Sequence, residues 1–300
     1  MRGVRALDWK RGSAPLALLL CLTAGCSRSA PESRFPTADA ALSRMHEAQR
    51  CSRGVSADAK LEYFGPEGRV RGNVLYLTSV PDRVRLDVWS PFGATISSLT
   101  SDGSRFALLD VRAKTFVHGP ANACNLALFT QVPLPPHALV DVLRGEAPVL
   151  VHDASGASIA WEGGRYVVRI ESKHGAVETI ELLPHDAAFA RPWQEQRVRV
   201  LSVQVEQFGV LLYRIELEGH ARVVTAPELK DPDGIEPPVP PSGPACQAEL
   251  PRSVRIEVPN AGHDLSLVSR ETFHNPPLRE GTFTQPQPGG VRVRYSPCGG

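Results

Sequence analysis

The chain has 300 residues, and its 33 Lys and Arg residues nearly balance its 32 Asp and Glu residues, giving a formal net charge of +1. This even mixture, with no block of like charge, argues against a nucleic-acid-binding chain and against a polybasic membrane patch. The 27 Pro and 25 Gly residues favour many short strands over long helices, and the length allows one large β domain or two ordinary ones.

The N-terminus has the pattern of a targeting segment. Basic residues within 1–11 precede an apolar run at 15–22, which is too short to span a bilayer as a stable helix. Small residues then lead directly into Cys26, so residues 1–25 resemble a bacterial lipoprotein signal peptide and Cys26 the cysteine that receives the lipid. An ordinary signal peptide cut elsewhere, or a short N-terminal anchor, is the alternative. By the same resemblance, Ser27 is compatible with sorting to the outer membrane.

A tether and a helix come next. Residues 26–36 are polar and contain two prolines, which suits a flexible link between a lipid and a folded domain. Thr37 can cap a helix over 38–50, in which apolar residues recur at steps of three and four. This spacing gives one apolar stripe, so we predict a helix that packs on a sheet.

A run of short strands follows. Alternating apolar and polar residues, bounded by turn residues, predict strands at 59–63, 70–78, 83–89, 95–100, 105–110 and 115–118. Because no helix intervenes, the pattern is typical of an antiparallel meander. The turn after the third of these strands is Ser90-Pro91-Phe92-Gly93, which places an apolar residue at its tip.

Helix signals interrupt the strands in the middle of the chain. We predict short helices at 121–129 and 135–145, the second with Pro at its start and Gly145 as its stop. The alternation then predicts further strands at 158–161, 166–171, 176–183, 197–207, 211–219, 254–258 and 264–269.

The last part of the chain is rich in proline. Residues 226–251 cannot form a β ladder where proline lacks the donor, so this insertion is expected to be an extended surface loop rather than a recognition motif. Residues 252–269 are expected to form a hairpin that completes the same sheet, and 275–300 is a Pro/Gly-rich tail. We therefore predict one domain over 37–300.

Four cysteines remain in the mature chain once Cys21 and Cys26 are set aside: Cys51, Cys124, Cys246 and Cys298. An even count in an oxidising compartment predicts two disulfides. All three pairings are open, and we favour Cys51–Cys124 with Cys246–Cys298, because each pair then lies within one half of the chain. A zinc site is the rival, but the sequence has no Cys-x-x-Cys pair to support it.

No catalytic motif emerges. The sequence lacks a Gly-x-Ser-x-Gly elbow, a His-Glu-x-x-His helix and a phosphate-binding glycine loop, so we expect no enzyme, no metal and no cofactor. The acidic turn Asp231-Pro232-Asp233-Gly234 hints at calcium but lacks the later Glu of an EF-hand.

Residues 83–148 resemble the outer-membrane lipoprotein acceptor LolB and its relatives in the LolA-like fold. The matching pieces are the turn 90–95, the hairpin through 102–103, the strand ending at 114–116 and the segment 132–145 with Leu139, Leu143, Arg144 and Gly145. The greater length, the Pro-rich insertion, the tail and the four mature cysteines depart from a typical LolB and indicate a divergent relative.

The resemblance implies a mainly β fold: a curved antiparallel sheet, open as a half-barrel, covered by short helices over an apolar cavity. The cavity would be lined by Leu86, Val88, Trp89, Ile96, Leu139 and Leu143. In LolB-like proteins the turn that corresponds to Pro91, Phe92 and Gly93 carries an exposed apolar residue that contacts the membrane.

The expected function follows from this resemblance. The chain would be anchored at the outer membrane, face the periplasm, take the acyl chains of lipoproteins or lipids from a soluble LolA-like carrier, and help to place them in the bilayer. The alternative is a structural or sensing lipoprotein that uses the same fold as a scaffold for protein partners.

Overall fold

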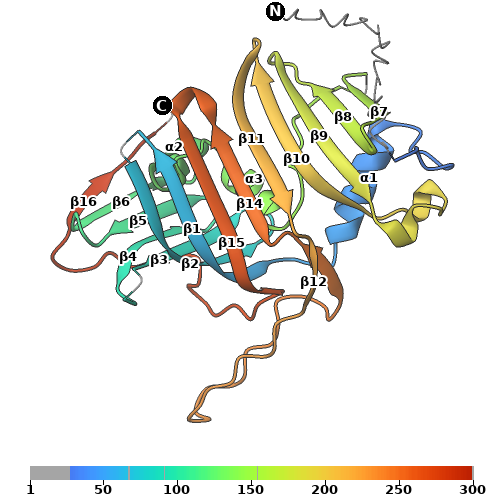
Figure 1. Ribbon diagram of the computed structural model, residues 1–300. Helices are drawn as coiled ribbons and strands as arrows, with labels where there is room; N and C mark the ends of the chain where they lie inside the picture. The colour runs from blue at the N-terminus through green and yellow to red at the C-terminus, as the bar shows by residue number, and fades with distance from the viewer. Residues whose placement is uncertain (1–27, 67, 91, 154, 299–300) are drawn as a thin grey trace, which may run out of the picture.

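A curved sheet of 14 strands dominates the computed structural model, and it remains open along one side (Figure 1). The structure describes residues 28–298, apart from 67, 91 and 154. The expected signal peptide and Cys26 therefore lie outside the described residues. The expectation of a mainly β, open half-barrel covered by helices is confirmed.

The predicted helices and strands occur in the predicted order, and three further strands, at 221–224, 247–250 and 292–295, were not predicted. The first part contains α1 (Ala38–Gln49), β1 (Val55–Gly65), β2 (Gly68–Ser79), β3 (Arg83–Trp89), β4 (Thr95–Ser101), β5 (Arg105–Asp110) and β6 (Thr115–Pro120). Two helices, α2 (Ala123–Thr130) and α3 (Pro136–Leu143), separate it from β7 (Ala157–Glu162), β8 (Arg165–Glu171), β9 (Ala176–Pro184), β10 (Val198–Gln207) and β11 (Val210–Glu218). The last strands are β12 (Ala221–Val224), β13 (Gln247–Leu250), β14 (Ser253–Val258), β15 (His263–His274) and β16 (Arg292–Tyr295).

The strand order shows how two meanders become one sheet. It runs β16-β6-β5-β4-β3-β2-β1-β15-β14-β11-β10-β9-β8-β7, so the β14–β15 hairpin joins the two meanders at the centre. The expectation that residues 252–269 complete the same sheet is thus confirmed. All neighbours in this sheet pair antiparallel except β16, which lies parallel to β6.

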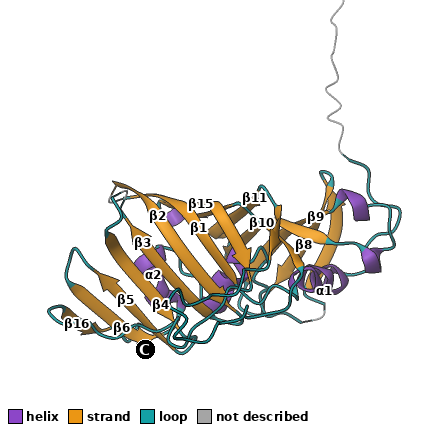
Figure 2. Cartoon of the chain, turned by 90° about the horizontal axis from the view of Figure 1, so that it is seen from below, coloured by secondary structure: helices purple, strands orange, loops and turns teal. Residues whose placement is uncertain are grey.

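The helices cover the concave face of the sheet (Figure 2). Helix α1 contacts β7 and β10, α2 contacts β5, and α3 contacts β2 and β3. The Thr37 hydroxyl accepts a hydrogen bond from the Ala40 N–H at 3.2 Å, which satisfies one free donor at the start of α1. The apolar stripe of α1, including Ala41, Leu42 and Met45, is buried in the core. No helix within the described residues combines the length and apolar character needed to cross a bilayer.

Strand register fixes which side chains face the core. Leu86 on β3 is opposite Leu99 on β4, which is opposite Leu108 on β5, and all three belong to the core or pack against it. Since successive side chains in a strand point to opposite faces, Arg85, Asp87 and their cross-strand neighbours lie on the other side of the sheet. We call this convex side the outer face.

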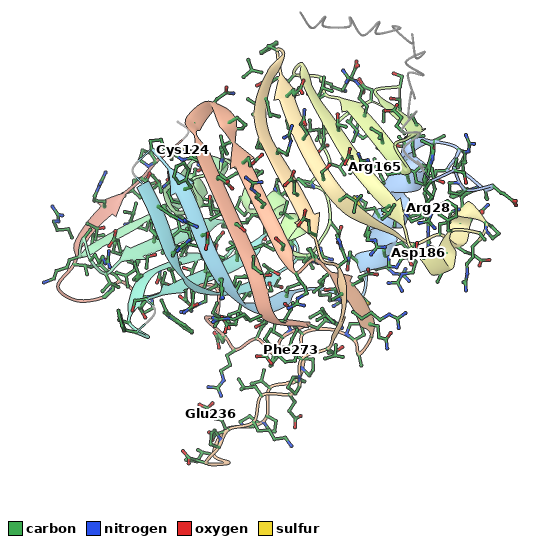
Figure 3. All side chains as sticks on the ribbon, viewed as in Figure 1. Arg28, Cys124, Arg165, Asp186, Glu236 and Phe273 are labelled. Carbon is green, nitrogen blue, oxygen red and sulfur yellow. A yellow bond between two sulfur atoms is a disulfide. The ribbon has the colours of Figure 1, made fainter. Side chains whose placement is uncertain are left out.

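The Pro-rich segment differs from the expectation in two respects. Residues 247–250 form β13 and pair with β12, because no proline lies between residues 244 and 251 and this stretch keeps its backbone N–H donors. Residues 226–246 form an arm that projects from the sheet, and Glu236 lies near its tip (Figure 3). Inside the arm, Leu229 and Val239 exchange two backbone hydrogen bonds of 3.0 and 2.9 Å.

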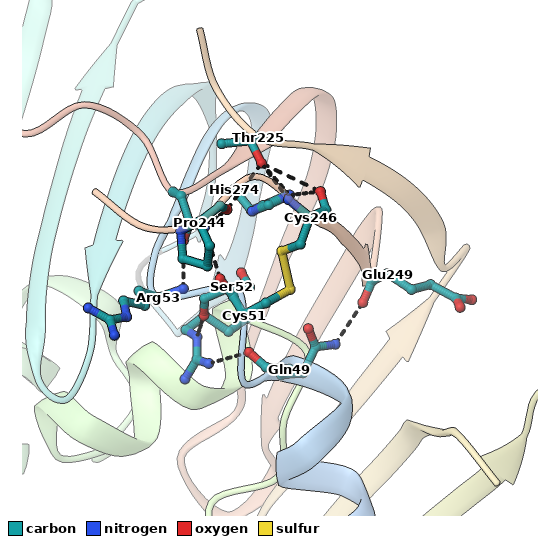
Figure 4. The surroundings of a disulfide bond; sticks show 11 residues. Gln49, Cys51, Ser52, Arg53, Thr225, Pro244, Cys246, Glu249 and His274 are labelled. Atoms are coloured by element: carbon teal, nitrogen blue, oxygen red, sulfur yellow. Dashed lines mark hydrogen bonds between the residues drawn. A yellow bond between two sulfur atoms is a disulfide. The ribbon is translucent and has the colours of Figure 1, made fainter. Parts of the chain in front are cut away.

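The favoured disulfide pairing is wrong. The bridges are Cys51–Cys246 and Cys124–Cys298, with sequence separations of 195 and 174 residues. The first forms because β1 pairs with β15, which brings the start of the first meander beside the chain that precedes β13. Around it, the Asn275 amide donates to the carbonyls of Cys51 and Pro244, both at 2.9 Å (Figure 4 shows the bridge and its neighbours). Sheet topology, not closeness in sequence, therefore decides the pairing.

Candidate functional site

The hairpin between β3 and β4 presents one aromatic side chain to solvent. Ser90 N donates to Ala94 O at 2.8 Å, and Gly93 N donates to Ser90 O at 3.0 Å, which closes the turn. Gly93 has a φ of +81°, a left-handed conformation that glycine adopts without steric cost. Pro91 lies outside the described residues. Phe92, at the tip, is 96% exposed, so its ring is held away from the core.

Further aromatic residues lie at the same edge of the sheet. Because each hairpin reverses the chain, the tips of β1–β2, β3–β4, β10–β11 and β14–β15 all fall on one side, and the Asn260 amide joins two of them by donating to Leu211 O at 2.7 Å. We call this edge the hairpin rim; its described residues are 64–66, 68, 90, 92–94, 208–211 and 259–262. Phe64 and Phe208 on this rim are 62% and 84% exposed. Phe208 has a φ of +52°, which strains a bulky residue.

The residues expected to line an acyl cavity lie in or beside the core. Leu86, Val88, Leu139 and Leu143 are buried members of one continuous hydrophobic cluster, and Ile96 packs against it half-buried. Trp89, at the end of β3, is exposed. The first four therefore contact other core side chains in this structure, and a role in holding an acyl chain stays a prediction for the whole set.

A cavity of about 500 Å³ lies elsewhere, on the outer face of β4 to β6 beneath the C-terminal tail. Register places Thr100, Ala107 and His118 side by side on this face, with Phe116 next along β6. The tail roofs them with Phe283 and Gln285, and Tyr295 of β16 stands at the side. We call this cavity the outer-face pocket. None of the residues expected to line a cavity is among its walls.

The sequence did carry a signal for this pocket. Most strands alternate apolar residues with charged ones, but 95–101 on β4 reads Thr-Ile-Ser-Ser-Leu-Thr-Ser and has no charge on either face. Four of these residues, 98 to 101, are buried, which requires cover on both sides of the sheet. An uncharged strand in the midst of charged ones thus indicates a second covering layer.

A buried ion cluster ties α1 to the end of α3. Arg144 donates to Ser52 O at 2.8 Å and to Gln49 O at 3.1 Å, and it pairs with Glu146 at 2.9 Å. Glu146 also bonds His46 at 2.8 Å, and this bond raises the pKa of the His46 ring. Because the cluster donates hydrogen bonds to the last carbonyls of α1, we interpret it as a structural contact between α1 and α3 rather than a ligand site.

A second buried carboxyl fixes the segment between α3 and β7. Glu178 on β9 is fully buried, and its Oε2 accepts a hydrogen bond from Leu150 N at 2.9 Å. Burial raises the pKa of Glu178 to about 7, so this side chain is held mainly as the neutral acid in mildly acidic solution.

Glu249, on β13, lies among basic side chains near the C-terminal end of α1. It pairs with His185 at 2.9 Å and with Arg199 at 3.2 Å, and the hydrogen bond from His185 lowers the pKa of Glu249. Burial lowers the pKa of the neighbouring His220 ring to about 4. Within the described part of the chain, no group of three His, Cys, Asp or Glu side chains is placed to hold a metal ion.

The acidic turn in the arm uses its carboxylate internally. Asp231 Oδ2 accepts hydrogen bonds from Ile235 N at 2.8 Å and Glu236 N at 3.0 Å, and these bonds lower the pKa of Asp231. The calcium alternative is therefore unnecessary to explain this sequence, because an Asx-type turn accounts for it.

The comparisons with known proteins show similarity in fold only. The chain is similar to a DUF1329 family protein from Desulfovibrio piger, with 9% identity, a TM-score of 0.51, and coverage of 82% of this chain and 95% of that one. Two further neighbours are a putative outer membrane lipoprotein-sorting protein domain from Vibrio parahaemolyticus (10% identity, TM-score 0.48, 82% and 97% covered) and a LolA superfamily protein from Nitrosomonas europaea (10% identity, TM-score 0.49, 84% and 99% covered). No protein-family model and no curated protein matches the sequence.

The fold assignment therefore rests on the first of these neighbours and on the sheet itself. The open half-barrel, with helices on the concave face, is the architecture that the resemblance implied, and the first neighbour shares this fold. Function has to be argued from its surfaces.

Proposed function

We propose that this chain is an outer-membrane lipoprotein, anchored through Cys26 and facing the periplasm, that binds acyl chains of lipoproteins or lipids and helps to place them in the membrane. No covalent chemistry is part of this role. A soluble LolA-like carrier would deliver the acyl chain, the hairpin rim would contact the bilayer, and the lipid on Cys26 would keep the molecule at its place of work. The sequence around Cys26 and the half-barrel fold support the proposal.

The observation that carries the proposal is the exposure of Phe92. A benzyl side chain that is 96% exposed at a hydrogen-bonded hairpin tip contributes nothing to the core. Transferring it into the apolar part of a bilayer would gain on the order of 2 kcal/mol. Phe64 and Phe208 on the same hairpin rim add apolar surface where the chain would meet a membrane.

The test is made on the full chain in its native cell. Depleting the protein should leave other lipoproteins mislocalised, and wild-type chain should restore them. Phe92→Glu should fail to restore sorting while folding normally, whereas Phe92→Leu, which keeps an apolar tip, should restore it. Val268→Glu on the outer face of β15 is the matched control for an added charge and should also restore it. Unchanged sorting on depletion would remove the transport role.

A second candidate is a scaffold for protein partners, and the arm favours it. Residues 226–246 project from the sheet, and Ile235 near the tip is exposed. The packed core around Leu86 and Leu139 also suits a scaffold. Deleting 230–238 should abolish partner capture if this function is correct and leave lipoprotein sorting intact.

A further inference from the structure

The C-terminal tail is built into the outer face rather than left loose. Arg85 Nη1 donates to Thr282 O at 3.2 Å, and the Gln285 side chain donates to Ser98 O at 3.1 Å and Ala107 O at 2.9 Å. Phe283, between these two anchors, is only 7% exposed. The tail thus behaves as a packed layer over β3 to β5 and not as a solvent-exposed end.

The far end of the tail is fastened independently. Strand β16 pairs with β6 over Arg292 to Tyr295, and Cys298 is bonded to Cys124 of α2. Asn122 Nδ2 donates to Cys298 O, and Asn125 Nδ2 donates to Ser296 O at 3.2 Å. Between the two fastened parts, residues 286–291 include Gly289 and Gly290, whose Cβ positions would meet open space. The roof of the outer-face pocket therefore has a glycine-containing link beside it.

The walls of the outer-face pocket combine aromatic and polar side chains. Phe116 and Ala107 form its floor, Phe283 its roof, and Tyr295 one side, where its ring stacks edge-on to His118 at 5.5 Å. Hydroxyl and amide groups of Thr100, Ser104, Thr284, Gln285 and Gln287 are interspersed among them. A volume of about 500 Å³ suits one small ligand or one chain of a lipid.

The mouth of this pocket carries one basic and one acidic side chain, Arg105 and Asp102. Arg105, at the start of β5, is 82% exposed in its side chain and reaches Asp102 only at 3.8 Å, which is too weak a pair to occupy it. Aromatic rings in the walls and an accessible arginine at the entrance are complementary to an apolar chain that ends in an anionic head group.

We propose that the outer-face pocket binds a single fatty acyl chain whose anionic head group is met by Arg105. This inference rests on the proposed function, because it supplies the acyl site that the packed concave core does not offer. It assigns the ligand to the convex side of the sheet, between β4–β6 and the tail. The tail is then a component of the binding site, and its fastening by β16 and Cys298 preserves the roof.

The first experiment is site-specific photocrosslinking of the full chain in its native cell. A photoreactive phenylalanine derivative replaces Tyr295 in the pocket, Phe92 at the hairpin rim, or Val268 on the outer face of β15. Position 295 should give an adduct that carries acyl mass, and position 268 should give none. An adduct of lipid size identifies a free fatty acid or phospholipid, whereas one of protein size identifies the acyl chain of a lipoprotein.

The second experiment fills the pocket without removing any of its contacts. Ala107→Phe adds a ring to the floor of the pocket and should reduce the acyl adduct at position 295 about tenfold, equivalent to about 1.4 kcal/mol of binding. Val268→Phe is the matched control and should leave the adduct unchanged. Formation of both disulfides and resistance to protease show that each variant is folded. Arg105→Ala should reduce the adduct less, because only the head group loses a partner.

The outcomes separate this inference from the proposed function. Acyl chains that copurify with the full chain, without an adduct at 295 and without an effect of Ala107→Phe, would overturn the outer-face site and leave acyl binding elsewhere in the molecule. A chain that carries no acyl chains and gives no adduct at any position would overturn both. An adduct at 295 that Ala107→Phe removes establishes the site, whatever the effect of the chain on sorting.

Discussion

The two halves of the sheet differ in whether their outer faces are exposed to solvent or covered by another layer. On β8 to β11 and the adjoining β14, the outer face is a ladder of ion pairs and hydrogen bonds open to water: Arg165 to Glu181 at 3.3 Å, Ser202 to Glu181 at 2.9 Å, and Arg255 to Glu257 at 2.7 Å. On β4 to β6, the outer face is largely uncharged, and the tail covers it. One sheet is thus two layers thick in one half and three layers thick in the other.

This difference follows from what each face must satisfy. A solvated face needs only charged and polar side chains, whose surface ion pairs contribute little to stability. A covered face has to replace lost hydration, as Asp87 does by bonding Arg85 at 2.6 Å and Ser98 at 2.5 Å beneath the tail. Substitutions in the third layer should therefore change stability more than substitutions on the solvated face. A ligand would also be enclosed by this layer.

The largest expected effect comes from the bridge at the junction of the two halves. Replacing Cys51 and Cys246 by serine should lower the free energy of unfolding by about 2–5 kcal/mol, because the bridge closes a long loop beside the β1–β15 pair. Denaturant unfolding measures it. The Cys124→Ser/Cys298→Ser variant is the comparison: hydrogen exchange should show faster opening confined to the tail and β6. Equal loosening of both halves by the second variant would contradict the layered description.

Removing the Phe283 ring from the third layer should have the next largest effect on stability. Phe283→Ala leaves a void over β4 and β5 and should destabilise the protein by about 3 kcal/mol. Val268→Ala on the bare outer face of β15 should change stability by about 0.5 kcal/mol or less. Thermal or urea unfolding of the two variants checks this contrast, and similar losses for both would show that the tail adds no packed layer.

A pH-dependent effect is expected from Glu178 in the half that lacks a third layer. Its pKa rises from 4.5 in the unfolded chain to about 7 in the folded one, so the unfolded state loses its proton first and stability falls as the pH rises through this window. Glu178→Gln removes that cost and should raise the free energy of unfolding at about pH 8 by on the order of 1–3 kcal/mol. Urea titrations at about pH 5 and about pH 8 should show the gain shrinking at the lower value. A gain that does not depend on pH would refute the assignment.

The smallest effect is expected on the solvated ladder. Arg214 donates to Gln204 at 3.1 Å and lies 3.9 Å from Glu257 on the outer face of β11. Arg214→Ala should cost about 0.5 kcal/mol or less, and salt should diminish even this difference. Unfolding at low and high ionic strength checks it. A loss as large as that of Phe283→Ala would erase the distinction between the two outer faces.

Much of the fold could be predicted from the sequence because local signals agreed with the final structure. The alternation in 83–89 and 165–171 and the turn glycines located the strands of both meanders. Strand β16 was missed because four residues in a Pro/Gly-rich tail carry no such signal, and β6 supplies the pairing from far away. The arrangement of the meanders around β14–β15 likewise depends on contacts between distant segments.

Some features of the candidate sites could likewise be predicted from the sequence, and others depend on contacts between distant segments. The turn alone left the exposure of Phe92 open, because a ring at a hairpin tip can also fold back onto the core, and only the resemblance favoured exposure. The disulfide pairing could not be predicted, because Cys51 meets Cys246 only once β1 lies beside β15. The outer-face pocket needs two distant pieces, the uncharged β4 and the tail around Phe283, and neither piece alone reveals it.

The central place of the β14–β15 hairpin has a consequence for how the molecule is made. Strands β1 and β11 are both synthesised before the hairpin that fills the gap between them, which spans residues 253 to 274. Until then each meander has an unpaired edge that is open to neighbouring chains. A sheet completed by its last strands cannot finish during synthesis and folds slowly, as its many long-range pairings require. Shortening the chain from the C-terminus should therefore cause aggregation rather than a smaller folded protein.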